Sequence, residues 1–201
     1  MRRLLVGCSL FLLCLPDRAL AWGLAHPLRR PVEVCVTGVL AAPAKIDGRP
    51  WDGVGGVIDG ETLRPLMEVL ASRAPAYSAV LPLVLAIGEL VDTPEVAARV
   101  QVVSDDENDG LQLDLPPWQD ALVGTWGCSP LVLTLNKAAR LRVLAWDVDV
   151  SEPDAIGAVE LTSAELDRAR KSHTILHVWV GDRTNYQLLF LDISVREVPG
   201  G

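Results

Sequence analysis

The feature that most constrains the fold is a series of short β-type runs that extends from about residue 95 to the end of the chain. These runs are rich in Val, Leu and Ile, and they are separated by Gly, Pro, Asn and Asp, which favour turns. In the last run, Leu189, Leu191, Ile193 and Val195 alternate with polar residues. Successive side chains of a strand point to opposite faces of a sheet, so this period predicts one buried and one solvated face. Many such strands predict an all-β chain folded as an antiparallel sandwich or barrel.

The predicted strands share this composition and are bounded by turn residues. They are VEVCVTGVL (32–40), VAARVQVV (96–103), LQLDL (111–115), LVLTL (131–135), RLRVLAWDV (140–148), AVEL (158–161), TILHVWV (174–180) and YQLLFLDISVREV (186–198).

Residues 61–91 differ from the strand series and predict a helical, apolar insertion. Leu63, Leu66, Met67 and Leu70 are spaced as one stripe of a helix. Residues 78–91 are apolar on every side, which fits a buried helix or a strand, and we interpret them as a helix because Ser78 and Pro82 suit a helix start. The insertion can serve as a lid, as a lipid-inserting hairpin, or as extra core packed on the sandwich. A further short helix is expected at 162–171, where Thr162 and Glu165 have capping-box spacing.

The N-terminus has the pattern of a secretory signal peptide. Basic residues at 2 and 3, an apolar run over 4–15, and Ala19-Leu20-Ala21 predict cleavage after residue 21. Lipid attachment at Cys8 is an alternative. Residues 22–31 then form a leader, residues 32–198 form one domain, and the protein is expected to be secreted or periplasmic. No later run reaches the roughly 18 apolar residues that a transmembrane helix needs.

Export also changes the charge and the cysteine count. Cleavage leaves 15 basic and 25 acidic residues, for a net charge near −10. This sign disfavours nucleic acid and bare anionic lipid as partners and suits divalent cations. Of the four cysteines, only Cys35 and Cys128 remain. In an oxidising compartment they predict one disulfide, with two separate buried thiols as the alternative.

One acidic stretch, LRVLAWDVDVSEPDAIGAVEL (141–161), carries a specific resemblance. A strand leads through Val143 and Trp146 into an Asp-x-Asp pair and then into a third Asp, Ile156 and Gly157. This pattern resembles the third loop of the C2 domain family. LPPWQD (115–120) and DTPEV (92–96) are similar to two other segments of that family. The resemblance extends over residues 32–198 and is specific in the third loop.

The resemblance implies an eight-stranded antiparallel β-sandwich whose loops at one end hold calcium and contact phospholipid headgroups. The implied ligands in the third loop are Asp147, Asp149 and Asp154. In the first loop they are Asp47 and Asp52, with Asp92 competing for the second position because residues 53–91 interrupt the family's pattern. Calcium prefers six to eight oxygen ligands, which carboxylates supply. The alternative for all of these residues is ordinary turn chemistry.

Other motifs give weaker signals. SDDENDG (104–110) has the spacing of oxygen ligands but lacks the final Glu of a helix-loop-helix calcium site, so it predicts a solvated hairpin. His173 and His177 share a face of the strand expected there, where they fit a transition-metal pair or isolated histidines. Trp51, in a Gly-rich loop, is a candidate lipid or partner contact, with core packing as the alternative.

No catalytic motif is found, because nucleophile-elbow, phosphate-loop and zinc-protease patterns are absent and His26 lies in the leader. The sequence therefore predicts a binding module and not an enzyme. A calcium-dependent module that contacts phospholipid is the first hypothesis. The alternative is a structural or protein-binding sandwich with a decayed metal site, which uses residues 61–91 as its contact surface.

Overall fold

The structure is a computed structural model of the 201-residue chain. It describes residues 31–45, 49–51, 76–88, 93–103, 110–119, 121–136, 138–148, 153–184 and 187–198. The predicted signal peptide, the leader up to residue 30 and the expected helix at 61–70 lie outside the described residues.

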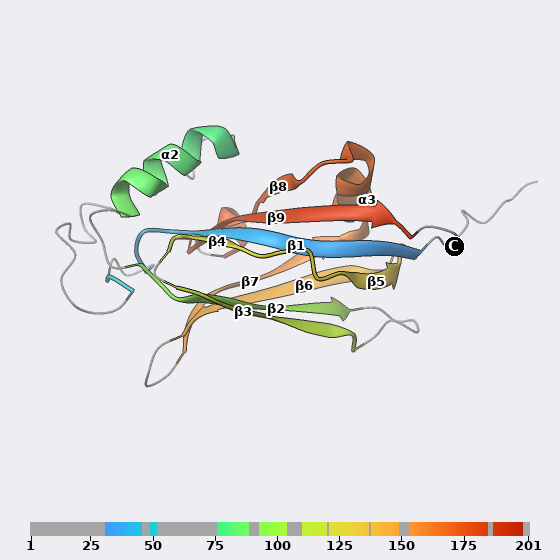
Figure 1. Cartoon of the computed structure of the whole chain (residues 1–201), viewed down its shortest axis with the longest axis horizontal. Helices are drawn as coiled ribbons and strands as arrows, with labels where there is room; N and C mark the ends of the chain where they lie inside the picture. Colours follow the sequence, from blue (N-terminus) through green and yellow to red (C-terminus); the bar gives the residue numbers. More distant parts are fainter. Residues whose placement is uncertain are drawn as a thin grey trace, which may run out of the picture.

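Two antiparallel sheets pack face to face and form a sandwich (Figure 1). One sheet has the order β4-β1-β9-β8, with β5 also paired to β1, and the other has the order β3-β2-β6-β7. The predicted antiparallel sandwich is therefore confirmed. The strands are β1 (Pro31–Ala41), β2 (Val96–Val103), β3 (Gln112–Trp118), β4 (Val123–Thr125), β5 (Leu131–Thr134), β6 (Arg140–Asp147), β7 (Asp154–Thr162), β8 (Leu176–Trp179) and β9 (Leu188–Glu197).

The edge of the first sheet is a strand in two pieces. β4 pairs with Gly38–Leu40 of β1, and β5 pairs with Pro31–Val34 of the same strand. The described part of the chain thus contains nine strands, one more than the eight predicted, because β4 is an additional short strand on this edge. The interruption holds Cys128, which is disulfide-bonded to Cys35 of β1 with their Cα atoms 5.2 Å apart. The predicted disulfide thus fastens the gap between β4 and β5 to the neighbouring strand.

The core lies between the sheets and follows the alternation seen in the sequence. In β6, Leu141, Val143 and Ala145 are buried, whereas the residues between them are partly exposed. β9 keeps the same period in its second half, where Ile193 and Val195 are buried. Because strands with one buried face must place it against a second layer, this pattern leads directly to two packed sheets.

Helix α2 (Tyr77–Gly88) lies outside the sandwich at one end of it (Figure 1). Val80, Val84 and Ile87 are buried. This face of the helix therefore adds to the core, which is the third of the alternatives that the sequence left open for the insertion. The segment is a helix, as predicted, but it is buried on one face only. In the part of the chain that the structure describes, we find no helix with the length and hydrophobicity needed to cross a membrane.

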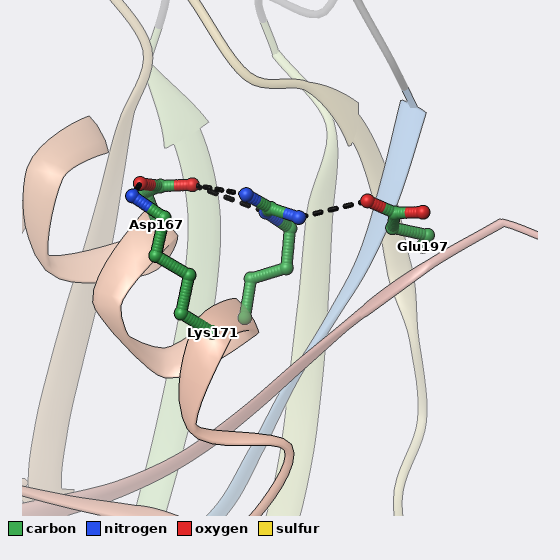
Figure 2. A network of polar contacts seen from close by, with 4 residues as sticks. Asp167, Lys171 and Glu197 are labelled. Atoms are coloured by element: carbon green, nitrogen blue, oxygen red, sulfur yellow. Dashed lines mark hydrogen bonds and ion pairs between the residues drawn. The ribbon is translucent and has the colours of Figure 1, made fainter.

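Helix α3 (Ser163–Ser172) follows β7, as the capping-box spacing predicted. The Thr162 hydroxyl accepts a hydrogen bond from the Glu165 backbone N–H, and the Glu165 carboxylate accepts one from the Thr162 backbone N–H, which completes the box. Figure 2 shows how the helix end is tied to β9: Arg170 bridges Asp167 of α3 and Glu197, with nitrogen–oxygen distances of 2.7 Å to each. Lys171 also pairs with Asp167.

Acid should weaken the start of α3 through Glu165. Burial acts to raise the pKa of this carboxyl, but the Thr162 hydrogen bonds and the Arg183 guanidinium outweigh it and lower the pKa below its ordinary value. A folded-state pKa below that of the unfolded chain stabilises the fold above the unfolded pKa, and this gain disappears as the pH falls through the folded pKa. We expect the free energy of unfolding of wild type to be about 1 kcal/mol higher than that of Glu165→Gln at pH 7. Chemical unfolding at a series of pH values from 7 to 3 should show the difference vanish at the acid end, and a pH-independent difference would contradict this account.

Candidate functional site

Two of the predicted acidic residues meet at one end of the sandwich. β6 ends at Asp147, β7 begins at Asp154, and the two residues are direct partners in the antiparallel ladder. Asp149 lies among residues 149–152, outside the described residues. The strand ends of β6 and β7 are at the same end of the molecule as helix α2 and the end of β1 (Figure 1). We call this the loop end, defined by the described residues 42–45, 49–51, 147–148 and 153–154.

Asp147 has a structural role, because it connects the end of β6 to the residue that precedes β2. Its side chain is fully buried at 0% exposure, and its Oδ1 accepts a hydrogen bond of 2.7 Å from the backbone N–H of Glu95. The Val148 N–H donates to the Glu95 carbonyl at 3.0 Å. The carboxylate thus extends the β2–β6 ladder beyond Val96. The two-residue period of the strand predicts that Asp147 is buried, because it falls on the same face as Leu141, Val143 and Ala145.

Asp154 forms an ion pair with Lys45, whose ammonium nitrogen contacts its Oδ2. The Lys45 side chain is only 15% exposed, whereas that of Asp154 is 48% exposed. The same ammonium lies 5.7 Å from the centre of the Trp51 ring, within the range of a cation–π contact. A lysine from the loop after β1 therefore supplies the positive charge next to Asp154.

Trp51 is part of the core. Its side chain is 1% exposed, and its indole N–H donates a 2.8 Å hydrogen bond to the carbonyl of Ala42. The core-packing alternative is the one that the structure shows, and the ring has no free surface for a lipid or protein partner in this conformation. Its role at the loop end is to hold the segment that carries Lys45.

The described residues of the loop end do not fit a calcium ion. Calcium needs six to eight oxygens, but one carboxylate here is buried on a backbone amide and the other is paired with an ammonium. Within the described ranges, no three His, Cys, Asp or Glu side chains gather as metal ligands do. Asp47, Asp52 and Asp92 lie outside those ranges.

A second polar cluster, which the sequence did not indicate, anchors helix α2 on β8 and β9. His177 Nδ1 lies 2.6 Å from Asp192 Oδ1, and the Tyr77 ring stacks on the imidazole with centroids 3.8 Å apart. Burial raises the pKa of the Tyr77 phenol, and the Asp192 carboxylate, which accepts its hydrogen bond, raises it further. Phe190 meets the Tyr77 ring edge-on. The cluster fixes the first turn of α2 to the sheet.

The predicted shared face of His173 and His177 is wrong. His173 ends helix α3 with φ of 54°, a left-handed conformation, whereas His177 lies on β8. The strand begins only at Leu176, because α3 extends to Ser172 and a turn follows it. The two imidazoles therefore belong to different elements. The signal available for the true partner of His177 was the alternation of β9, which places Asp192 on the polar face.

The chain was compared with protein families, curated sequences and solved structures. No protein-family model matches the chain, and no curated protein sequence matches it. The calcium-bound pair of C2 domains of extended synaptotagmin 2 is similar in structure with a TM-score of 0.47 and 10% identity, over 83% of this chain and 45% of that chain. This chain thus spans less than half of that two-domain structure. A single C2 domain of plant extended synaptotagmin 1 matches with a TM-score of 0.45 and 10% identity, over 86% of this chain and 97% of that domain.

Human GIVD cytosolic phospholipase A2, solved with an inhibitor and terbium chloride, matches with a TM-score of 0.45 and 12% identity, over 85% of this chain and 18% of that enzyme. The roles of individual residues in this chain rest on its own geometry.

Proposed function

We propose that this protein is a binding module, without catalytic activity, that docks a protein partner on the outward face of helix α2. The observation that supports this proposal is the surface of the helix itself. Ala79, Pro82, Leu85 and Ala86 are exposed on one side, and Leu85 is 49% exposed. None of the twelve residues of α2 carries a charge. An apolar helix face presented to solvent marks an interaction site when it is contiguous.

A protein partner fits this face better than a membrane does. Helices that lie in the lipid interface carry Lys and Arg on a polar face, and α2 has neither. The chain has a net charge of −8, which anionic lipid repels. The anchoring cluster of Tyr77, His177 and Asp192 also holds the helix in one orientation before any partner arrives, and a pre-ordered surface lowers the entropic cost of association.

Leu85→Glu should abolish partner binding without unfolding the protein, because a charge introduced on the apolar face must be desolvated in the complex. The matched control is Val132→Glu on β5, which changes a side chain of similar exposure, 46%, on another element. Wild type and both variants are immobilised and exposed to extracts of the source cells, and retained proteins are quantified by mass spectrometry. We expect a retained protein whose recovery falls at least tenfold with Leu85→Glu and is unchanged with Val132→Glu.

Equal loss in both variants, or a partner retained by Leu85→Glu, would refute a role for this face. Retention of wild type on vesicles that is lost in Leu85→Glu would assign the face to lipid instead. Near-ultraviolet circular dichroism of each variant checks that the fold is intact.

Calcium-dependent binding to phospholipid headgroups or another anionic surface is the second candidate function. It is favoured by the pairing of Asp147 with Asp154 at the loop end, since Asp149 lies between these two residues in the sequence. Asp149, Asp47, Asp52 and Asp92 would have to supply most of the ligands. Co-sedimentation with phosphatidylserine vesicles in millimolar calcium, compared with chelator, tests this candidate, and no calcium-dependent binding would exclude it.

We also propose that the protein is exported, with residues 1–21 as its signal peptide. The Cys35–Cys128 disulfide supports this location, because disulfides form and persist in oxidising compartments. N-terminal sequencing of the protein from its source should begin at Trp22. A chain that starts at Met1 and remains inside the cell would contradict the proposal.

A further inference from the structure

We infer that Lys45 is the resident cation of the loop end and that Asp154 is therefore not a metal ligand. The inference concerns the end of the sandwich and is independent of the partner proposed for α2. It explains how two acidic strand ends can lie side by side in the described structure without requiring a divalent ion. One carboxylate is neutralised by the ammonium of Lys45, and the other accepts a hydrogen bond from a backbone amide.

The position of Lys45 is set by its surroundings. Its backbone N–H donates a 2.9 Å hydrogen bond to the carbonyl of Arg49, which closes the loop after β1. Its ammonium lies against the ring of Trp51, and that ring is fixed by the core and by its hydrogen bond to Ala42. A lysine held in this way has already lost part of its rotamer freedom on folding, so pairing with Asp154 costs less entropy than it does for a free surface lysine.

Displacing the ammonium would be unfavourable. Lys45 is 15% exposed, so removing its partner would leave a largely desolvated positive charge. A calcium ion bound to Asp154 would also lie close to that charge and be repelled by it. Lys45 thus does at this end what a bound ion does in an acidic loop: it neutralises the carboxylate and connects the loop after β1 to the start of β7.

Asp147, the other described acid at the loop end, also has a structural contact of its own. It is fully buried, and its Oδ1 is engaged with the Glu95 N–H at 2.7 Å. Turning this carboxylate toward solvent would break the hydrogen bond that fastens β6 to the residue before β2. The two described acids therefore have separate structural partners.

A double-mutant cycle with and without calcium tests the inference. Lys45→Met, Asp154→Asn and the double variant are unfolded with urea in chelator and in millimolar calcium, using the full folded chain. In chelator, the effects of the two single changes should be non-additive, with a coupling of about two- to fivefold in the unfolding constant. Arg99→Met and Asp114→Asn, which break the exposed Arg99–Asp114 pair between β2 and β3, form the matched control cycle.

The calcium arm decides whether Asp154 binds metal. No calcium effect on wild type, or a calcium effect that Asp154→Asn retains, supports the inference, since any metal site then lies among other residues. A stabilisation of wild type by calcium that Asp154→Asn abolishes would overturn it. Additive effects of Lys45→Met and Asp154→Asn would overturn the pairing. Lys45→Arg keeps the positive charge, so its free energy of unfolding should respond to calcium as that of wild type does. This variant serves as a second test if Lys45→Met is poorly folded.

Discussion

Replacing Trp51 by alanine is expected to lower the free energy of unfolding by about 3 to 5 kcal/mol, the usual cost of removing a buried aromatic side chain. The ring is among the largest fully buried side chains in the described structure. The change also removes the indole hydrogen bond to Ala42 and the surface on which the Lys45 ammonium rests. We therefore expect the loss to be global and not confined to a loop. Equilibrium urea unfolding followed by far-ultraviolet circular dichroism measures it.

Trp51→Phe is the matched control. It keeps most of the buried apolar volume but loses the hydrogen bond, so it should cost clearly less than the alanine variant. A Trp51→Ala protein as stable as wild type, but with weakened lipid or partner binding, would return Trp51 to the role of surface contact that the sequence left open.

Removing the disulfide is the second change with a large expected effect. Cys35 and Cys128 are separated by 93 residues. In the chain-entropy model, closing a loop of this size lowers the conformational entropy of the unfolded chain and raises the free energy of unfolding by about 4 kcal/mol. The double variant Cys35→Ala/Cys128→Ala should lose about this amount in urea unfolding. The loss should act mostly on the unfolded state, with the added effect that residues 126–130 are released from β1.

Wild type in reducing agent is the control for that prediction. Its stability should fall to that of the double variant, and the double variant should not respond to the reducing agent. A double variant within about 1 kcal/mol of the oxidised wild type would show that the crosslink contributes little, as happens when the unfolded chain keeps residual structure.

The strands could be predicted where their pattern is local. β2 begins at Val96 and ends at Val103, as the sequence predicted, because the strand is rich in apolar residues and turn-forming residues flank it on both sides. Strand β4, Val123–Thr125, was not predicted, since three residues are too few to show a period. β7 begins at Asp154, earlier than expected, because pairing with β6 extends it into a polar stretch.

The candidate site was predictable in part. The resemblance placed Asp147 and Asp154 at one end of the sandwich, and strand pairing brings them together there. The partners of these acids could not be read from the chain, because Lys45 is 109 residues from Asp154 in sequence and Glu95 is 52 residues from Asp147. Which cation meets a carboxylate depends on tertiary packing. The alternation of β6 did contain the information that Asp147 points inward.

The division of the first sheet's edge strand into β4 and β5 has a consequence for how this protein meets others. A long, regular edge offers a row of unused backbone amides and carbonyls onto which a foreign strand can add. Here that row is broken in two by the segment that carries Cys128, and on the second sheet the outer strand β3 contains Pro116 and Pro117, which have no N–H to donate. Neither of these two margins is a good template for strand addition. Strand addition, and aggregation through it, is therefore expected to be disfavoured at these two of the four sheet edges, the other two being β8 and β7.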